Sequence, residues 1–295
     1  MQLEGIHTAL VTPFDDRGEL DEQAVVRLVH AQVDAGVRGL VVAGGTGEGL
    51  ALTDEEWARL LSVVVQAAAG RATVTAHVSA LSTAAAVRNA ERARTIGAEI
   101  AMLQAPYDVS LTDDEVALYF AAVAAVGLPV MAYNNVSTGI SLSVDLIARL
   151  AEIEGVRYLK DSSSDAARMV EVQLGTPAEF QVLLGKDSFA LFGFLSGARA
   201  AVLGSANAFP EACVRLHRLA VLVEDQSSAR AAWRDIAPLM RFFEQESYVA
   251  AVKAATTLGG IPVGDPRSPT LPLPVAKRAE LERLLAAAQQ APATA

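Results

Sequence analysis

The sequence predicts an α/β fold, a (β/α)8 TIM barrel with a C-terminal helical extension. Eight short, β-rich apolar runs alternate with helical segments along the chain. The runs are continuously apolar, which is typical of parallel strands that are buried on both faces. The chain has 295 residues, 52% of them hydrophobic, and this length suits one barrel of about 250 residues with an appendage.

The predicted strands follow one another at the intervals that βα units require. In chain order they are Thr8–Val11, Gly39–Val42, Thr73–Val78, Ile100–Leu103, Val130–Tyr133, Val156–Lys160, Gln181–Leu184 and Ala200–Leu203. A doubly wound sheet is the competing architecture, because both use right-handed crossovers. Eight regular units without a clear break favour the closed barrel.

The helices between the strands carry start signals. Thr53–Glu56 (TDEE) and Thr112–Glu115 (TDDE) have the capping-box pattern, in which threonine and glutamate each satisfy an amide of the first turn. The stretch 116–133 has no charge over about the length of a membrane helix. Gly127 and Pro129 divide it, so it predicts a helix, a turn and a buried strand.

From about Pro210 onward the pattern becomes entirely helical. This indicates the last barrel helix and then a helical appendage. The expected division is a barrel of residues 1–224 and a C-terminal helical subdomain of residues 225–295.

Composition limits the classes of partner. The formal net charge is −10 and the sequence pI is about 4.9, which argues against nucleic acid or an anionic membrane surface as a partner. The single cysteine, Cys213, cannot form an internal disulfide and lies in an amphipathic helical pattern. The first four residues carry no basic or long apolar export signal, so a cytoplasmic location is expected.

In a barrel of this kind the functional residues lie where the strands end. Lys160 ends an apolar strand, on the same predicted side as Val156 and Tyr158. Lysine is rarely buried. It could extend to solvent or pair with Asp161 or Asp165, or it could be an amine that attacks a carbonyl to form a Schiff base.

Schiff-base chemistry also needs a group that moves protons. Tyr133 ends the preceding strand, 27 residues before Lys160, as one βαβ unit requires. It could instead be a core tyrosine whose hydroxyl has found a partner. Together the two residues favour a Schiff-base site with Tyr133 as the proton carrier.

The glycine-rich turn GGTGEG, residues 44–49, does not match the common nucleotide-binding motifs. It lacks the G-x-G-x-x-G spacing of a dinucleotide turn and the lysine of a P-loop. The next helix begins only near Thr53, too late for its N-terminus to meet a pyrophosphate directly. The glycines of the turn would instead let backbone amides approach a small carboxylate, and Thr46 would add a hydroxyl.

The ordered set VTPFDDRGELD, GGTGE, YN, YLKDSSSD, LLGKD and VKAATTLGGIPVGDPRSPTLPL resembles the dihydrodipicolinate synthase and N-acetylneuraminate lyase family over nearly the whole chain. The resemblance implies a barrel with C-terminal helices, usually a homotetramer. It also implies a class I mechanism on pyruvate or another 2-oxo acid, without a metal or an organic cofactor.

The resemblance also implies roles for individual residues. Lys160 resembles the Schiff-base lysine and Tyr133 the proton-shuttling tyrosine. Gly45 and Thr46 resemble the pair that holds the carboxylate of the 2-oxo acid. Val202 resembles the residue whose backbone carbonyl faces the site, and Ser162 occupies the place of a hydroxyl-contacting side chain in sugar-acid aldolases.

Three departures separate this chain from the synthase branch of the family. That branch typically has a second threonine where this chain has Gly45, and a second tyrosine where Asp108 follows Tyr107. It also has an arginine after strand five, which YNNVSTGIS lacks. A bidentate carboxylate clamp is therefore missing there.

The expected function is a class I lyase that acts on pyruvate or a 2-oxo-3-deoxy sugar acid by retro-aldol cleavage or dehydration. The alternatives are condensation of pyruvate with aspartate semialdehyde (4-hydroxy-tetrahydrodipicolinate synthase) and a non-catalytic 2-oxo-acid-binding protein. A phosphate or dinucleotide ligand at the glycine turn is a further alternative. No metal site is expected, because the four histidines lack metal-ligand spacing.

Overall fold

The computed structural model describes residues 2–107, 110–136, 139 and 141–289. Its eight parallel strands close into one barrel in the order β1-β2-β3-β4-β5-β6-β7-β8. The strands are β1 (Gly5–Ala9), β2 (Gly39–Val42), β3 (Thr73–His77), β4 (Ile100–Leu103), β5 (Val130–Asn134), β6 (Val156–Asp161), β7 (Gln181–Leu184) and β8 (Ala200–Leu203). The predicted fold class is confirmed.

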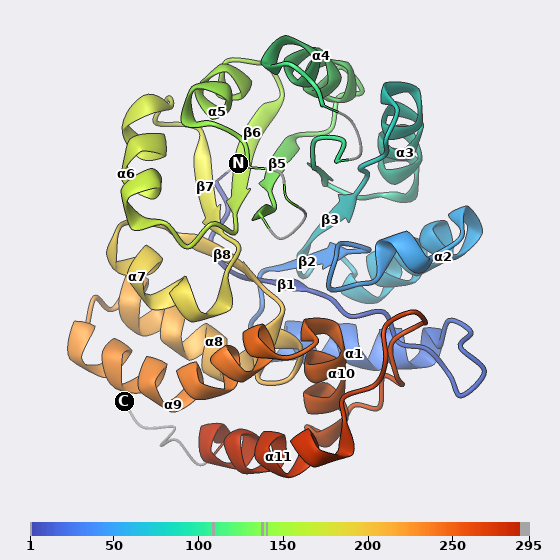
Figure 1. The fold of residues 1–295 in the computed structure, drawn as a ribbon, viewed down its shortest axis with the longest axis vertical. Helices are drawn as coiled ribbons and strands as arrows, with labels where there is room; N and C mark the ends of the chain where they lie inside the picture. Colours follow the sequence, from blue (N-terminus) through green and yellow to red (C-terminus); the bar gives the residue numbers. More distant parts are fainter. Residues whose placement is uncertain (1, 108–109, 137–138, 140, 290–295) are drawn as a thin grey trace.

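Helices surround the barrel and continue beyond its last strand (Figure 1). They are α1 (Glu22–Asp34), α2 (Asp54–Ala68), α3 (Thr83–Ile96), α4 (Asp113–Ala124), α5 (Val144–Ala151), α6 (Ala166–Gly175), α7 (Ala190–Leu195), α8 (Pro210–His217), α9 (Gln226–Gln245), α10 (Tyr248–Leu258) and α11 (Val275–Gln289). In Figure 1, α9, α10 and α11 gather beside α8 and α1. The boundary after residue 224 lies just before α9, and the division into two domains stays a prediction.

Both predicted capping boxes form. Thr53 caps α2 and Thr112 caps α4, and each glutamate three residues later accepts a hydrogen bond from the amide of its capping threonine. The uncharged stretch 116–133 divides as predicted into the end of α4, a turn at Gly127 with φ +93°, and β5. No described helix has the length and apolar character needed to cross a membrane.

The first strand lies earlier than the sequence predicts. It runs Gly5–Ala9, not Thr8–Val11, because Gly5 already pairs with Ala200 of β8. Polar His7 interrupts the apolar run and hid this start from a prediction based on apolar runs. The amide of Val11 has left the sheet and donates to the Asn207 side chain.

The core has two layers. An inner cluster fills the barrel, and a larger outer cluster lies between the strands and the helices. Tyr158 belongs to the inner cluster but Val156 to the outer one, so they do not share a side as predicted. The ladder between β5 and β6 has a register irregularity that leaves Arg157 unpaired between them, and this reverses the alternation.

Candidate active site

Tyr133 and Lys160 lie side by side at the carboxyl ends of neighbouring strands. They are register partners in the β5–β6 ladder. Nζ of Lys160 lies 4.1 Å from the centroid of the Tyr133 ring, and the exposed fractions are 6% for the lysine and 9% for the tyrosine. The face of an aromatic ring stabilises a cation that has left bulk water. The two residues predicted to carry the chemistry are therefore in contact.

Neither aspartate near Lys160 in sequence forms an ion pair with it. Asp161 accepts hydrogen bonds from Asn134 Nδ2 at 2.6 Å and from Ser163 Oγ at 2.7 Å. Asp165 caps α6 by accepting from the Arg168 amide. Within the described part of the chain, no carboxylate lies within ion-pair distance of Lys160. The alternative of a paired surface lysine is wrong.

The glycine turn projects from the end of β2. In the structure it is bounded by Ala43, whose φ is +57°, and Glu48, whose φ is +54°, because a short 3-10 helix begins at Gly49. Gly45 at its tip has open space where a Cβ would be. Among the described residues, the amides of Gly45 and Thr46 have no acceptor. The turn therefore presents two free N–H groups at the strand ends, as an anion site requires.

Ser162 and Val202 are both near the barrel interior. The Ser162 hydroxyl donates to the Gly185 carbonyl at 2.9 Å, so toward a ligand it can act only as an acceptor. The Val202 side chain lies in the inner cluster with Tyr133 and Tyr158. Contact between the Val202 carbonyl and a ligand stays a prediction.

His77 is a residue of this region that the sequence reasoning missed. It ends β3, and its Nε2 has no hydrogen-bond partner among the described residues. Burial, and after it the positive charge of Lys160, lowers the pKa of His77 to about 4, while a hydrogen bond to the Ala43 backbone opposes the fall. His77 is thus a neutral imidazole between the lysine and the glycine turn. Its place at a strand end was the signal that could have found it.

A second group joins the barrel to the extension, and its tyrosine was not predicted from the sequence. Asp187, after β7, accepts hydrogen bonds from the Ser205 amide at 3.0 Å and from the hydroxyl of Tyr248 at 2.5 Å. Burial, followed by the charge of Asp187, raises the pKa of Tyr248 well above its ordinary value, and Tyr133 adds to the rise. Tyr248 therefore brings α10 to the mouth of the barrel, although strand-end reasoning has no means of finding a helical residue.

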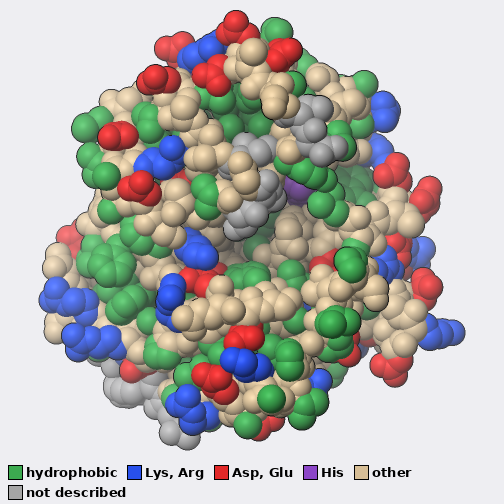
Figure 2. All heavy atoms as spheres, in the orientation of Figure 1, with side chains coloured by type: hydrophobic (Ala, Val, Ile, Leu, Met, Phe, Trp, Pro, Cys, Tyr) green, Lys and Arg blue, Asp and Glu red, His purple; other side chains and the backbone are tan. Residues whose placement is uncertain are grey.

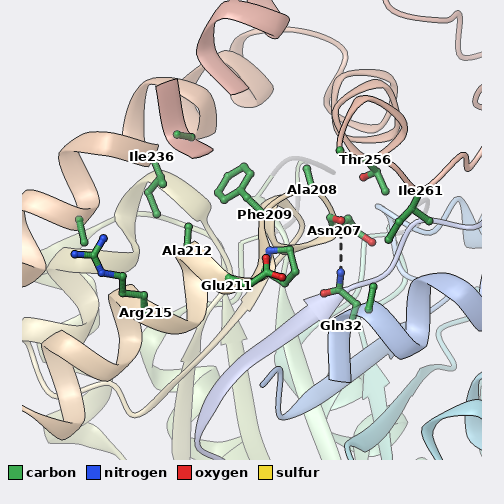
Figure 3. A pocket seen from close by; sticks show the side chains of 15 residues that line it. Gln32, Asn207, Ala208, Phe209, Glu211, Ala212, Arg215, Ile236, Thr256 and Ile261 are labelled. Carbon is green, nitrogen blue, oxygen red and sulfur yellow. Dashed lines mark hydrogen bonds between the residues drawn. The ribbon is translucent and has the colours of Figure 1, made fainter. Parts of the chain in front are cut away.

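Figure 2 shows this face of the molecule, with a hollow near its centre and a histidine side chain at its wall. A separate cavity of about 470 Å³ lies between α1, α8 and the C-terminal helices (Figure 3). There Gln32 donates to the Asn207 carbonyl at 3.5 Å, and Asn207 Nδ2 donates to Ala9 and Gly204 carbonyls. These polar side chains are thus already hydrogen-bonded to other groups of the protein. None of the predicted site residues lines the cavity. No group of three or more potential metal ligands is found among the described residues.

The model of the dihydrodipicolinate synthetase family matches residues 2–288. The chain belongs to this family, and it is a lyase of the family. A 4-hydroxy-tetrahydrodipicolinate synthase of Exiguobacterium sp. is 36% identical over 279 residues, which cover 94% of this chain and 95% of the relative.

Solved structures of the family are similar along almost the whole chain. A putative dihydrodipicolinate synthetase from Pseudomonas aeruginosa has a TM-score of 0.94 at 32% identity, covering 97% of this chain and 100% of that one. A dihydrodipicolinate synthase from Acinetobacter baumannii, complexed with pyruvate, has a TM-score of 0.94 at 29% identity and covers 98% and 99%. The resemblance seen in the sequence is confirmed at the level of family and fold.

Proposed function

We propose that this lyase works through a Schiff base between Lys160 and a 2-oxo acid, and that its substrates are 2-oxo-3-deoxy sugar acids. The observation that carries the proposal is the buried Nζ of Lys160, 4.1 Å above the Tyr133 ring and without a carboxylate partner among the described residues. A desolvated amine is a better nucleophile than a solvated or ion-paired ammonium.

The carboxylate of the 2-oxo acid binds the glycine turn. The free amides of Gly45 and Thr46 donate to its oxygens, and the Thr46 hydroxyl adds a third donor. Hydrogen bonds to a charged acceptor contribute more than neutral ones, about 1.5–3 kcal/mol each. The carbonyl carbon next to the carboxylate is then presented to Lys160.

The reaction begins with the formation of an iminium between Lys160 and C2 of the substrate. Nζ attacks C2, and the carbinolamine hydroxyl leaves as water with the phenolic proton of Tyr133, so that a C2=N⁺ bond and a Tyr133 phenolate remain. In retro-aldol cleavage, Tyr133 takes the C4 hydroxyl proton, the C3–C4 electron pair moves into the iminium, and an aldehyde departs. Protonation of the enamine at C3 and hydrolysis release pyruvate and the free amine. In dehydration, the Tyr133 phenolate takes a proton from C3 to give the enamine, and the C4 hydroxyl then leaves as water with that proton, which forms a C3=C4 bond next to the restored iminium.

The preference for sugar acids rests on what lines the site. Ser162 Oγ has acceptor capacity for a substrate hydroxyl, and we expect the Val202 carbonyl to accept from a second hydroxyl. Because Gly45 stands where the synthase branch typically has a threonine, this chain lacks one hydroxyl of that branch's proton relay. No arginine occurs in the loop 134–143. A second carboxylate therefore has no guanidinium fork in that loop.

Condensation of pyruvate with aspartate semialdehyde is the second candidate. It is favoured by the names of the relatives, several of which are 4-hydroxy-tetrahydrodipicolinate synthases at 34–38% identity. Both candidates share Lys160, Tyr133 and the carboxylate turn, and differ in what lies beyond C3 of the bound 2-oxo acid.

Substrate profiling by mass spectrometry tests the proposal. The protein is incubated with a panel of 2-oxo-3-deoxy sugar acids and, separately, with pyruvate and aspartate semialdehyde. We expect pyruvate plus an aldehyde, or a product lighter by one water, from at least one sugar acid. Condensation product alone would assign the synthase reaction, and no turnover in any arm would favour a non-catalytic 2-oxo-acid-binding protein.

The proposed assembly is a homotetramer or a dimer of this chain. Exposed apolar side chains occur at Leu174 of α6 and Phe192 of α7, and again at Leu50 and Leu81 near α2 and α3. In Figure 1 these two pairs of helices lie on opposite sides of the barrel. Exposed apolar side chains on two sides of the barrel are consistent with the proposal of two self-contacts per chain.

A further inference from the structure

Lys253 is a buried lysine that the proposed reaction does not use. It lies on α10 in the helical extension, and only 1% of it is exposed. Burial lowers the pKa of Lys253, and the neighbouring Glu48 carboxylate opposes the fall. A lysine this deep must have all its donors satisfied.

The three Nζ protons of Lys253 join separate parts of the chain. Nζ donates at 2.9 Å to the Thr12 carbonyl, at 2.9 Å to Glu48 Oε1 and at 2.9 Å to the Asp265 carbonyl. It also lies 4.4 Å from the centroid of the Phe14 ring. One side chain of the extension thus connects the loop after β1 with the end of the glycine turn.

Glu48 is held at both carboxylate oxygens. Oε2 accepts from the backbone amide of Arg267 at 2.7 Å, while Oε1 is bound to Lys253. Arg267 in turn donates to the Ala51 carbonyl at 2.8 Å. The side chain of the residue that ends the glycine turn is therefore held by the C-terminal segment, while its backbone amide donates to the Gly45 carbonyl at 3.1 Å. Its φ of +54° is unfavourable for glutamate.

Thr12 makes a second connection to the turn. Its hydroxyl donates to the Gly47 carbonyl at 2.5 Å, and its own carbonyl accepts from Lys253. A Cβ at Gly47 would lie 2.8 Å from the Leu10 carbonyl oxygen, so the turn is also packed tightly there. Gly47 and Glu48 are thus held directly after Thr46, while the Gly45 tip stays open.

We propose that Lys253 is a positioning residue for the carboxylate turn: through Glu48 and Thr12 it sets the direction of the Gly45 and Thr46 amides. The inference rests on the proposed function, because it assumes that this turn binds the 2-oxo acid. It adds that the helical extension is a working part of the site. Donors that are already aligned bind an anion without the cost of ordering them on binding.

Borohydride trapping of pyruvate at a series of concentrations tests the inference. In Lys253→Met we expect the half-saturating pyruvate concentration to rise roughly tenfold, because misdirected amides lose charge-assisted hydrogen bonds. The yield of adduct at saturating pyruvate stays at the wild-type level, because Lys160 and Tyr133 are untouched. Lys277→Met, which removes the partner of Glu246 in the same extension, is the control and leaves both quantities unchanged.

A double variant separates positioning from stability. Lys253→Met leaves a buried carboxylate unpaired and lowers the melting temperature. Glu48→Gln with Lys253→Met removes that charge and recovers much of the melting temperature. The half-saturating concentration stays raised, because no ammonium then holds residue 48.

Three results would overturn the inference. One is a half-saturating concentration within about twofold of wild type in both variants, and another is its return to the wild-type value in the double variant. The third is a fall in saturating yield that tracks the melting temperature, which indicates a structural role alone. Wild-type protein that forms no adduct at any pyruvate concentration would instead remove the proposed function itself, and no substitution is needed to see it.

Discussion

Gly185 lies so close to β6, the strand that carries Lys160, that a larger residue at position 185 would push neighbouring side chains aside. A Cβ at this position would lie 2.3 Å from Ser162 Oγ and 3.0 Å from both the Asp161 carbonyl oxygen and Lys160 Cγ. The stem of Lys160 therefore passes over a bare backbone at the end of β7. A methyl group at position 185 would press on Lys160 Cγ and so turn Nζ to another direction.

Gly185→Ala is expected to lower kcat roughly tenfold to a hundredfold, because small misplacements of a reacting group are costly. The added methyl breaks the hydrogen bond from Ser162 and presses on the lysine stem. Steady-state kinetics together with thermal melting measure the effect. Gly175→Ala is the control, since its Cβ meets only Val144, at 4.0 Å. Equal kcat values for the two variants would contradict the close approach.

At this scale the sequence predicts contacts within the sheet better than contacts across it. Lys160 and Tyr133 could be paired in advance, because adjacent parallel strands place their ends together. The hydrogen bond of Ser162 to Gly185 and the closeness of His77 to Lys160 depend on side-chain packing inside a closed barrel. Nothing in the spacing of these residues encodes that packing.

Among the elements, β1 rests on β2 through a buried histidine. His7 is 1% exposed, and a Cβ at Gly39 of β2 would lie 1.8 Å from its Nδ1. Burial lowers the pKa of His7 to about 4 from 6.5, and neither ring nitrogen has a hydrogen-bond partner among the described residues. The folded chain therefore keeps this ring neutral.

The free energy of unfolding is expected to fall as the pH drops from about 6.5 to about 4. Over this window His7 binds a proton in the unfolded chain but not in the folded chain. The contribution of His7 to the free energy of unfolding is therefore fully present above about pH 6.5 and is lost as the pH falls toward about 4. The loss from His7 is about 3 kcal/mol at most. Urea unfolding of wild type and His7→Leu at several pH values measures it.

The leucine variant should show a shallower pH dependence by up to one proton, with His30→Leu, a change at an exposed position of α1, as the control. Parallel curves for wild type and His7→Leu would contradict the burial of a neutral His7.

The same residue explains why the first strand was predicted at the wrong place. A polar side chain inside the barrel interrupts the apolar run that predicts a strand. The reversal at Val156 has a similar cause, because a local irregularity in the ladder leaves no mark in the apolar pattern.

For the whole molecule, alternation of strands and helices was enough to predict the barrel, because few architectures accommodate eight such units. The role of the extension could not be predicted in this way. Tyr248 and Lys253 lie on α10, and their partners Asp187 and Glu48 are 61 and 205 residues away along the chain. Contacts over such separations are fixed only by the packed fold.

The assembly is predicted at the same scale. Leu174 of α6 is 83% exposed, and in a tetramer it would be covered by a second copy. Leu174→Glu is expected to halve the mass of the assembly in sedimentation velocity without lowering the melting temperature of the chain. Leu271→Glu, at a position that is 75% exposed outside the helices, is the control. An unchanged mass for Leu174→Glu would contradict the proposed contact on α6.

The most direct test of the central claim is to locate the reduced pyruvate adduct. Wild-type protein is treated with pyruvate and borohydride, digested, and sequenced by tandem mass spectrometry. The predicted result is one adduct, on Lys160, that is absent in Lys160→Ala and retained in Lys186→Ala, which removes another lysine that follows a strand end. An adduct on a different lysine, or one that persists in Lys160→Ala, would contradict the assignment of Lys160 as the nucleophile.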